Sequence, residues 1–541
     1  LEDADTNQIF RIGKDSLLAI RQIRKFYAAR KNLPAWSFKG KMNAAADSLM
    51  EFIRDAEDYG LIPEDYHIRA LDTLTETIYN PADGSYNVTK LANADLLLTN
   101  AFFTFAVHVA VGRMENDSAK TRSWRITKLD TDVVVLLNNS LATFDFRGAL
   151  EGLEPARMEY HAVKVYMNNY RLQHTDSVWE RLPDKKSDSI GFFEMVRKRL
   201  IGSGDIDTAS KKLNDSIAMV EGLKKFQKRY FLEPDGKLGR NTIMALNMTP
   251  TDWIRQLAMN MERWRWEPPK FERRHMLVNL PAFKMSVWED DTIVMESRIV
   301  CGAVKTGTPE LDSKVYQIVL YPYWNVPYSI AWKEILPHVK RDTGYLRKHK
   351  YEVLDRNNQL VDPKTVSWKK YGRTNLPYKF RQMTGNENAL GIMKFEFHNR
   401  WSVYMHDTNA KKYFRYETRG FSHGCMRLDK YMELAYFLIR DDSVKLPKDT
   451  FDVWTKAGDQ RKINLRKPLP IHVRYFTAET DTLGNVKLRT DIYERDKHMI
   501  KVLYKHVDPS LNAPPIAAGP AHNEIPVKPV AVKPKAQLDF K

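Results

Sequence analysis

Phe421-Ser422-His423-Gly424-Cys425-Met426-Arg427 is the most informative stretch of the sequence, and Tyr404-Met405-His406-Asp407-Thr408 lies shortly upstream of it. A thiol with a pKa near 8.5 is only about 3% thiolate at neutral pH, so a nucleophilic cysteine needs a base or a positive charge beside it. Histidine is the usual base, and the two stretches offer His406 and His423. Cys425 is therefore a candidate nucleophile.

The spacing leaves the identity of the base open. His423 is two residues from Cys425, so along a strand the two side chains would share a face, although Gly424 fits a turn equally well. His406 lies nineteen residues upstream and comes within reach if the intervening chain folds back as a long hairpin. A glycine before the cysteine permits a sharp backbone whose amide N–H groups converge, as an oxyanion hole requires. The same residue types also fit a buried core thiol or part of a metal site.

The longer pattern resembles a known family. His406, fifteen intervening residues and then Ser422 to Arg427 are similar to the signature of L,D-transpeptidases of the YkuD type. The resemblance continues upstream over four further stretches, namely 278–283, 308–309, 321–327 and 385–395. A second set resembles the large Gram-negative subgroup that carries a scaffold domain, namely Phe26-Tyr27, Pro34-Ala35-Trp36, Asp58-Tyr59-Gly60-Leu61, the motif at 223–247 and Asn260-Met261-Glu262-Arg263-Trp264. Nearly the whole chain is covered.

The resemblance implies a catalytic assignment. Cys425 would be the nucleophile, and His406 would take its proton and later return it to the leaving amine. Asp407 would orient His406 mainly through its backbone carbonyl. His423, Gly424 and Cys425 itself would line the oxyanion hole.

The resemblance also implies a substrate-binding set. Tyr404 and Arg427 would bind or orient the substrate, and the arginine could fork onto a carboxylate of a stem peptide. A structural ion pair is the other interpretation of Arg427. Ser422 is counted with this set, although a structural hydrogen bond suits it better than a role as second nucleophile. Asp407 also belongs to this substrate-binding set. The resemblance implies neither a metal nor an organic cofactor.

The implied reaction is the formation of 3-3 cross-links in peptidoglycan. The donor is a tetrapeptide stem that loses D-alanine, and the acceptor is the side-chain amine of a diamino acid on a neighbouring stem. Carbapenems, which present an activated carbonyl, would acylate Cys425. Other readings are an L,D-carboxypeptidase or a protein-to-wall transferase with the same site, or an idle wall-binding scaffold. A zinc site of His406, His423 and Cys425 lacks a fourth ligand at suitable spacing.

The pattern along the chain predicts a multidomain α+β protein. Apolar residues recur at helical spacing in the first two hundred residues, Asp235-Gly236 marks a turn between two amphipathic helices, and short runs of branched residues start near Met276. The expected parts are a helical scaffold domain at 1–204, a small three-helix peptidoglycan-binding-like domain at 205–250, a linking helix at 251–270 that packs on the scaffold, a β-rich catalytic domain at 271–508 with a lid at about 337–379, and a flexible proline-rich tail at 509–541.

Composition narrows the function classes. The net charge of the 541 residues is +17, but it is spread along the chain without a nucleic-acid motif, so no nucleic-acid partner is expected. Cys301 and Cys425 are the two cysteines; they exclude a disulfide scaffold and leave a single disulfide open. The sequence contains no run of eighteen apolar residues, so it predicts no membrane-spanning helix.

The expected location is the periplasm. The sequence begins at Leu1, which we interpret as a product from which an export signal has been removed, and membrane association of the precursor stays open. Peptidoglycan stem peptides and glycan are the expected partners, and proteins of cell-wall synthesis could join them.

Overall fold

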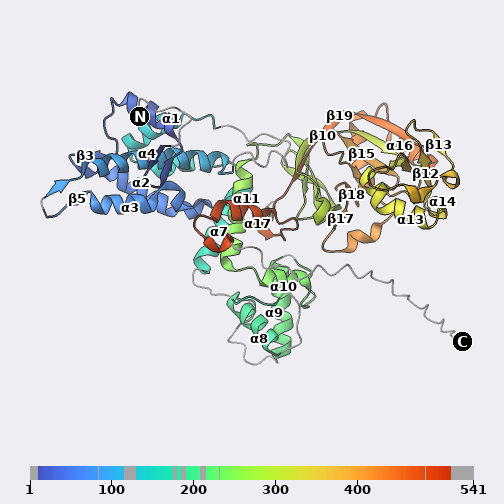
Figure 1. Ribbon diagram of the computed structural model, residues 1–541, viewed down its shortest axis with the longest axis horizontal. Helices are drawn as coiled ribbons and strands as arrows, with labels where there is room; N and C mark the ends of the chain where they lie inside the picture. The colour runs from blue at the N-terminus through green and yellow to red at the C-terminus, as the bar shows by residue number, and fades with distance from the viewer. Residues whose placement is uncertain are drawn as a thin grey trace.

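The computed structural model describes residues 10–82, 84–114, 129–174, 180–183, 190–207, 215–230, 232–481 and 483–512. Helices make up the N-terminal part and strands most of the C-terminal part, on opposite sides of a central group of helices (Figure 1). The expected multidomain α+β class is confirmed at this level. Of the expected proline-rich tail, residues 509–512 form a short 3-10 helix and 513–541 lie outside the described residues.

The N-terminal part is a helical body around one core. Its helices are α1 (Ile20–Ala29), α2 (Ala44–Arg54), α3 (Ile68–Thr77), α4 (Val88–Val111), α5 (Val133–Thr143) and α6 (Phe146–Glu151). Three two-stranded sheets accompany them, namely β1 (Phe10–Ile12) with β2 (Asp15–Leu17), β3 (Ser37–Phe38) with β4 (Lys41–Met42), and β5 (Tyr79–Asn80) with β6 (Ser85–Tyr86).

α4 is the one helix among the described residues that is long and apolar enough to cross a membrane. Inside the protein, 72% of its most apolar window is buried, which is the pattern of a core helix. One of its buried polar residues, Asp95, accepts hydrogen bonds from the backbone N–H groups of Ala35 (3.0 Å) and Trp36 (2.9 Å). The carboxylate therefore holds the loop before β3 against the core helix.

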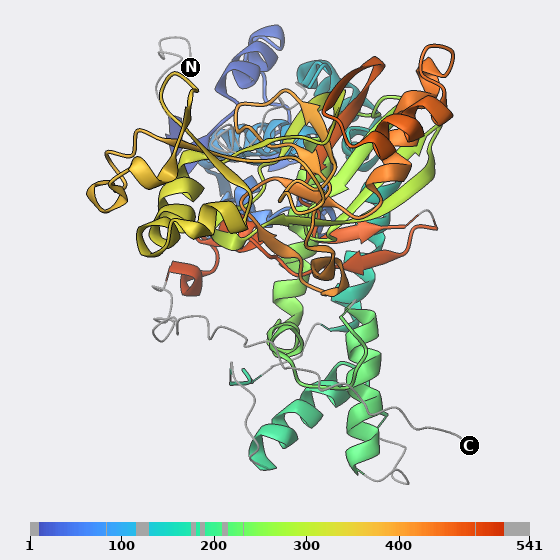
Figure 2. The ribbon, with the colours of Figure 1, turned by 90° about the vertical axis from the view of Figure 1, so that its right-hand side faces the viewer.

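Three helices meet at the centre of the molecule: α7 (Met158–Gln173), α11 (Pro250–Arg265) and α17 (Arg495–Tyr504) (Figure 1). A smaller unit of α8 (Ile190–Gly202), α9 (Asp215–Arg229) and α10 (Arg240–Leu246) projects from them, as the turned view shows best (Figure 2). The expected three-helix unit therefore starts earlier than residue 205, because α8 supplies its first helix. Whether it binds peptidoglycan stays a prediction.

The β-rich part is built on a nine-stranded sheet in the order β17-β9-β18-β16-β15-β10-β19-β7-β8. β8 also pairs with β9, which closes all strands except β17 into an eight-stranded barrel. The strands are β7 (Arg274–Asn279), β8 (Lys284–Glu289), β9 (Thr292–Gly302), β10 (Leu311–Leu320), β15 (Met393–Phe397), β16 (Met405–His406), β17 (Gly420–Ser422), β18 (Met426–Leu428) and β19 (Arg461–Arg474). Helices α15 (Tyr431–Ile439) and α16 (Lys448–Ala457) add Leu434, Leu438 and Phe451 to its core.

A compact insertion separates β10 from β15. It has a sheet of its own, in the order β11-β14-β12-β13, formed by β11 (Trp324–Asn325), β12 (Tyr351–Leu354), β13 (Leu360–Val361) and β14 (Lys379–Gln382). Helices α12 (Tyr328–Ile330), η5 (Ala331–Ile335, a π-helix), α13 (Leu336–Arg341) and α14 (Gly344–Lys348) pack with it. Its core includes Ile335, Trp368 and Phe380. The insertion, which we call the lid, is thus wider than the expected 337–379, because β11 precedes that range and β14 runs past its end.

The C-terminal part departs from the expected domain at 271–508. After β19 the chain forms β20 (Ala478–Thr480), β21 (Val486–Leu488) and α17, and residues such as Phe476, Leu488 and Met499 share a core with α7 and α11. Asn260 of α11 bonds the Thr477 hydroxyl (2.7 Å) and the Ala478 N–H (2.9 Å). The barrel ends near residue 475, and the following residues join the central helices, because their apolar side chains complete the face of α11.

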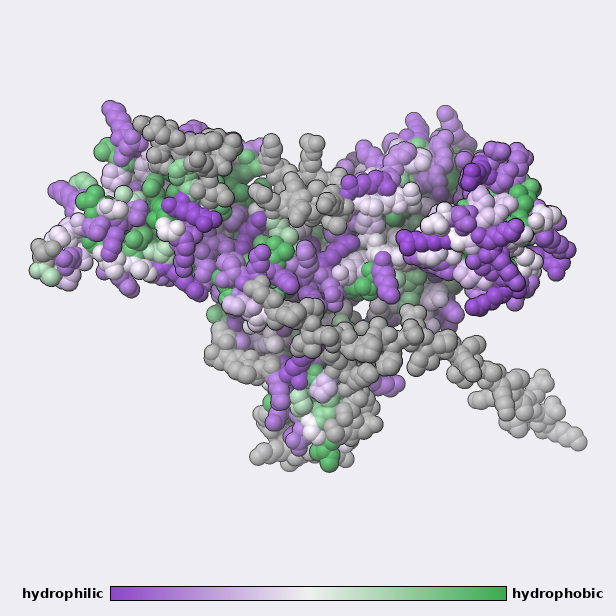
Figure 3. All heavy atoms as spheres, in the orientation of Figure 1, coloured by the Kyte–Doolittle hydropathy of each residue, from purple (hydrophilic) through white to green (hydrophobic). Residues whose placement is uncertain are grey.

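The visible surface is mostly hydrophilic on the β-rich side (Figure 3). Hydrophobic side chains gather instead over the N-terminal helical part, where Phe38 and Val88 are among the exposed ones. The β-rich part therefore presents a solvated, mostly polar surface.

Candidate active site

Two neighbouring strands place the candidate residues. β16 and β18 are parallel, with Met405 opposite Met426 and His406 opposite Arg427. Both methionines are fully buried in the barrel core, so the alternate positions of each strand face the other way. Tyr404, His406, Cys425 and Arg427 therefore project from the same face of the barrel wall.

The chain between the two strands is not the long hairpin that the sequence suggested. A hairpin pairs its strands antiparallel, whereas β16 and β18 are parallel. The connection instead passes through a 3-10 helix (Lys411–Arg415) and through β17, which pairs with the end of β9. Each strand is only two or three residues long, so no periodicity could have revealed this crossover.

His406 is held as a neutral imidazole. Its ring is 5% exposed, and its Nδ1–H donates to the carbonyl oxygen of Asp407, which leaves the lone pair on Nε2 as the proton acceptor. Burial and then the positive charge of Arg427 lower the pKa of His406 to about 3. The ring of Tyr404 lies edge-on to it at 5.7 Å.

Asp407 lies beside His406, in a position from which its backbone carbonyl can orient the imidazole, as the resemblance implies. Its backbone carbonyl accepts a hydrogen bond from the imidazole Nδ1–H, while its carboxylate accepts a hydrogen bond from the N–H of Ile392 (3.0 Å) and pairs with Lys411. Gly391 packs against the same carboxylate with φ of 60°, and a Cβ there would lie 2.1 Å from an Asp407 oxygen. Only a residue without a side chain at position 391 leaves room for the Asp407 carboxylate in this position.

Replacement of Gly391 by alanine is expected to slow acylation about tenfold or more while the protein stays folded. The new methyl group would push Asp407 away, and the hydrogen bond that orients His406 would be misplaced. Gly385→Ala is a suitable control, because its φ is also positive but nothing lies within 4 Å of the added Cβ. The measurement is the rate of covalent acylation together with the thermal unfolding midpoint. Equal rates for the two variants would contradict the proposed coupling.

The turn before Cys425 is fixed by hydroxyl groups. The Ser422 hydroxyl donates to the carbonyl of Cys425 and accepts the N–H of Gly424 (3.2 Å). The Thr308 hydroxyl accepts the N–H of Gly302 (2.9 Å) and donates to the carbonyl of Gly424 (2.8 Å). Because a trans peptide holds its C=O and N–H on opposite sides, the N–H of Cys425 is directed away from Thr308. The contacts of Ser422 fit the structural role.

Gly424 adopts φ of 116°, a conformation that side-chain-bearing residues rarely adopt. The glycine therefore allows the turn that the sequence associated with an oxyanion hole.

Cys425 is a protonated thiol in these surroundings. Burial raises the pKa of the thiol, and hydrogen bonds from Tyr404 and the charges of Lys394 and Arg427 oppose that shift. Cys301 is fully buried and burial raises its pKa to about 11. Both cysteines are free, so the disulfide that composition left open is not formed. Among the described residues, no group of three or more His, Cys, Asp or Glu side chains is placed to hold a metal ion.

Arg427 brings a partly buried positive charge beside the thiol. Its guanidinium lies 5.4 Å from the centroid of the Tyr413 ring, and its Nη1 is buried without a hydrogen-bond partner. Burial lowers its pKa, so the charged form is poorly compensated. Arg427 forms no ion pair with a carboxylate in the part of the chain that the structure describes. This favours a site open to a ligand anion over a structural ion pair within the protein.

His423 points toward the lid. Its Nε2 lies 2.6 Å from Oε1 of Glu334 on η5, and both side chains are about half exposed. The imidazole is thus engaged with a carboxylate outside the barrel, which leaves only the backbone of His423 for the oxyanion hole.

Sequence reasoning missed three contributors. Lys394 lies 4.1 Å from the centroid of the Tyr404 ring, Thr308 holds the Gly424 carbonyl, and Glu334 binds His423. Lys394 and Thr308 fall inside stretches that carried the family resemblance, but no motif singled them out. Glu334 lies before the expected lid and had no signal.

A thiol and a neutral imidazole on one face of two neighbouring strands, with a cation beside the thiol, suit an enzyme that transfers acyl groups through a thioester. Residues 273–446 match the family described as an L,D-transpeptidase catalytic domain, YkuD, and residues 21–167 match the family described as a scaffold domain. The chain therefore carries a catalytic domain of the YkuD-type L,D-transpeptidases, an acyltransferase family, together with an N-terminal scaffold domain. The expected family is confirmed.

A relative from Haemophilus influenzae, a putative L,D-transpeptidase, is 31% identical over 273 residues. The match covers 50% of this chain and 54% of the relative, so the chain spans about half the length of that curated protein. Among solved structures, an L,D-transpeptidase (Yku) from Stackebrandtia nassauensis matches with a TM-score of 0.19 and 14% identity, over 56% of this chain and 96% of that one. The Ldtfm-avibactam carbamoyl enzyme matches with a TM-score of 0.16 and 12% identity, over 42% and 64%.

Proposed function

We propose that this chain is a peptidoglycan L,D-transpeptidase that forms 3-3 cross-links through a thioester on Cys425. The observation that carries the proposal is the neutral His406, tied at Nδ1 to the Asp407 carbonyl, on the strand beside the one that Cys425 precedes. A buried imidazole of this tautomer can accept the thiol proton as the sulfur attacks and return it as the amine leaves.

The first step acylates the enzyme. The Sγ of Cys425 attacks the carbonyl carbon of the third residue of a donor tetrapeptide, and His406 takes the thiol proton. The N–H groups of the turn at Gly424 and Cys425 stabilise the negative oxygen. The bond to D-alanine then breaks, its nitrogen takes the proton from His406, and a thioester remains on Cys425.

The second step transfers the acyl group. The side-chain amine of a diamino acid on an acceptor stem attacks the thioester carbonyl and gives a proton to His406. The thiolate leaves and recovers that proton, and a new amide joins the two stems. Tyr404 orients the nucleophile, and the uncompensated Arg427 binds a carboxylate of a stem peptide.

We propose that the protein is exported and acts in the periplasm. The test of its activity uses purified protein and defined muropeptides. Disaccharide tetrapeptides should yield free D-alanine and tetrapeptide–tripeptide dimers with an amide between the two diamino acids, identified by mass spectrometry. Tripeptides without dimers would indicate an L,D-carboxypeptidase. Attachment of protein to wall fragments would indicate a wall-attachment transferase, and absence of all products would leave an idle wall-binding scaffold.

The lid is expected to favour the amine over water. Glu334→Gln weakens the contact between η5 and His423, so we expect the ratio of hydrolysis to cross-linking to rise about two- to fivefold, which is the range for a half-exposed ion pair. The matched control is Glu352→Gln, which removes another lid ion pair, to Arg381, inside the lid sheet. The measurement is the ratio of tripeptide to dimer products. A similar rise in the control, or none in Glu334→Gln, would contradict a role for this contact.

A further inference from the structure

A cavity of about 870 Å³ lies on the outside of the barrel, where it meets the central helices. Its floor is the outer face of β7, β8 and β9, since its lining residues on β8, namely Lys284, Ser286 and Trp288, alternate with the core residues Met285 and Val287. The walls are the first turn of α7, the end of α11, Phe476 and the β20–β21 hairpin. The volume is in the range of small-molecule sites.

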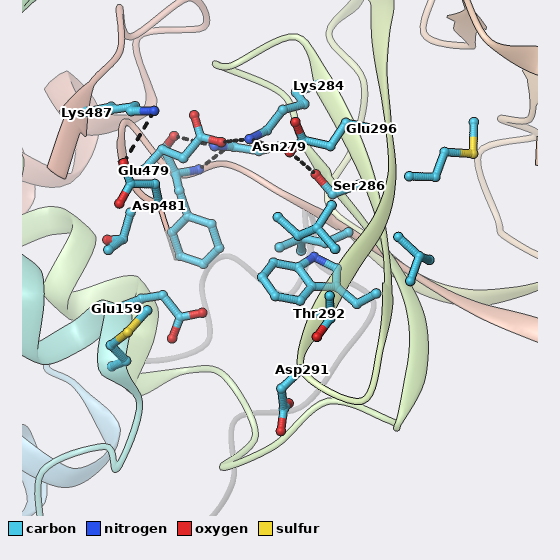
Figure 4. Close-up of a pocket in the computed structure, with 18 of the residues that line it drawn as sticks. Glu159, Asn279, Lys284, Ser286, Asp291, Thr292, Glu296, Glu479, Asp481 and Lys487 are labelled. Atoms are coloured by element: carbon cyan, nitrogen blue, oxygen red, sulfur yellow. Dashed lines mark hydrogen bonds and ion pairs between the residues drawn. The ribbon is translucent and has the colours of Figure 1, made fainter. Parts of the chain in front are cut away.

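One wall of the cavity is a finished polar network (Figure 4). Lys284 pairs with Glu296 (3.1 Å) and with Glu479, and the Ser286 hydroxyl donates to Glu296 (3.1 Å). Asn279 exchanges two hydrogen bonds with the backbone of Phe476. These groups are satisfied within the protein, so they make this wall rigid and do not by themselves call for a ligand.

The opposite side of the cavity is unfinished. Glu159, Asp291 and Thr292 lie around it, apart from the network of Lys284 (Figure 4). Among the described contacts, neither Glu159 nor Asp291 forms an ion pair. Their carboxylates are therefore available as acceptors for hydroxyl or amide donors.

Two indole N–H groups in the lining are also unsatisfied. The Nε1 atoms of Trp264 and Trp288 are both buried and lack a hydrogen-bond partner. Trp264 is 3% exposed and stacks on Phe476 with ring centroids 4.0 Å apart, so its donor cannot turn to find a partner elsewhere. A buried donor without an acceptor destabilises the folded protein. Each of these indole N–H groups therefore marks a position where a ligand oxygen could accept a hydrogen bond.

The charges of the lining select the ligand. Five carboxylates line the cavity, from Glu159, Asp291, Glu296, Glu479 and Asp481, against the three lysines Lys284, Lys430 and Lys487. This excess of negative charge occurs in a chain of net charge +17, so the cavity is disfavoured for an anionic stem peptide. Aromatic rings, carboxylate acceptors and indole donors together suit a neutral molecule with hydroxyl groups and flat C–H faces.

We infer that this cavity binds a short stretch of neutral saccharide. The sugar hydroxyls would donate to Glu159 and Asp291, a sugar oxygen would accept an indole N–H, and a C–H face would lie on the ring of Trp288. The choice of an N-acetylated amino sugar rests on the proposed function, because that is the backbone from which the stem peptides hang. The site would hold the glycan to the barrel wall at a place other than Cys425.

The test is calorimetric titration of the full chain with the β-1,4-linked tetramer of N-acetylglucosamine, which carries no stem peptide. Trp288→Ala should weaken binding about tenfold or more, and so should the double variant Glu159→Gln with Asp291→Asn. The double variant guards against a folding defect, since Asp291 is exposed and asparagine tolerates its φ of 61°. Trp454→Ala, at a half-buried tryptophan on α16 outside the cavity, should bind like the unmodified protein.

The inference is overturned if the tetramer gives no heat of binding at millimolar concentration, or if both cavity variants bind as well as the unmodified protein. Equal weakening in Trp454→Ala would also overturn it. Cys425→Ala should bind the tetramer normally while it lacks acyl transfer. Conversely, normal binding by a protein that forms no cross-links would leave the saccharide site standing and refute the proposed function alone.

Discussion

Replacement of Cys425 by serine should abolish covalent modification by a carbapenem. The carbapenem carbonyl is activated, so a competent thiol opens the ring and keeps the product as a thioester. A serine hydroxyl is a much weaker nucleophile and has no lowered pKa to help it, so we expect the acylation rate to fall by about a thousandfold or more. Intact-protein mass spectrometry after minutes of exposure reports the adduct directly.

The second cysteine supplies the control. Cys301 is fully buried with a raised pKa, and the Tyr493 hydroxyl donates to its sulfur (3.2 Å), so Cys301→Ser should leave the adduct in place. An adduct on the Cys425→Ser protein would point to another nucleophile. An unmodified protein that stays free of adduct, although its Cys425 is reduced, would refute the thioester mechanism.

The site residues could be named from the sequence because they sit in a short, dense motif. Residue type and spacing single out Cys425 and leave the base open, whereas the resemblance to the family signature selects His406 and Asp407. Gly424 stands out by its conformational freedom. Their arrangement could not be predicted in the same way. The parallel pairing of β16 with β18 depends on a crossover through β17, and strands of two or three residues carry no period.

Domain limits were harder to predict for a related reason. The lid buries a few side chains, such as Trp368 and Phe380, within a segment dominated by lysine, arginine and tyrosine, so its core is hidden by its surface. The residues after β19 keep the short apolar, strand-like sequence pattern of the barrel, yet they pack on α11. Gly60, in contrast, adopts the left-handed conformation (φ 65°) just past the end of a helix, a position where glycine is common and which the local sequence alone can indicate.

Replacement of His406 by glutamine should lower acylation by about a hundredfold to ten-thousandfold, the usual range for loss of a general base. Glutamine keeps a polar side chain near the Asp407 carbonyl but cannot accept the thiol proton. The rate is measured from the disappearance of a carbapenem chromophore at saturating enzyme. His423→Gln separates the two candidate bases, since its imidazole bonds Glu334; we expect a loss of less than about tenfold.

The pH profile gives the sharper distinction between the unmodified protein and His406→Gln. The pKa of His406 is lowered to about 3 and that of Cys425 is raised, so neither group titrates between pH 5 and 8. The unmodified protein should therefore acylate at a constant rate over that interval, with its acid limb near pH 3 and not near the ordinary histidine value. His406→Gln must rely on the free thiolate, so its residual rate should rise about tenfold per pH unit. An acid limb near pH 6.5 in the unmodified protein would instead show that the imidazole titrates as a solvated group, and the neutral pair would have to be abandoned.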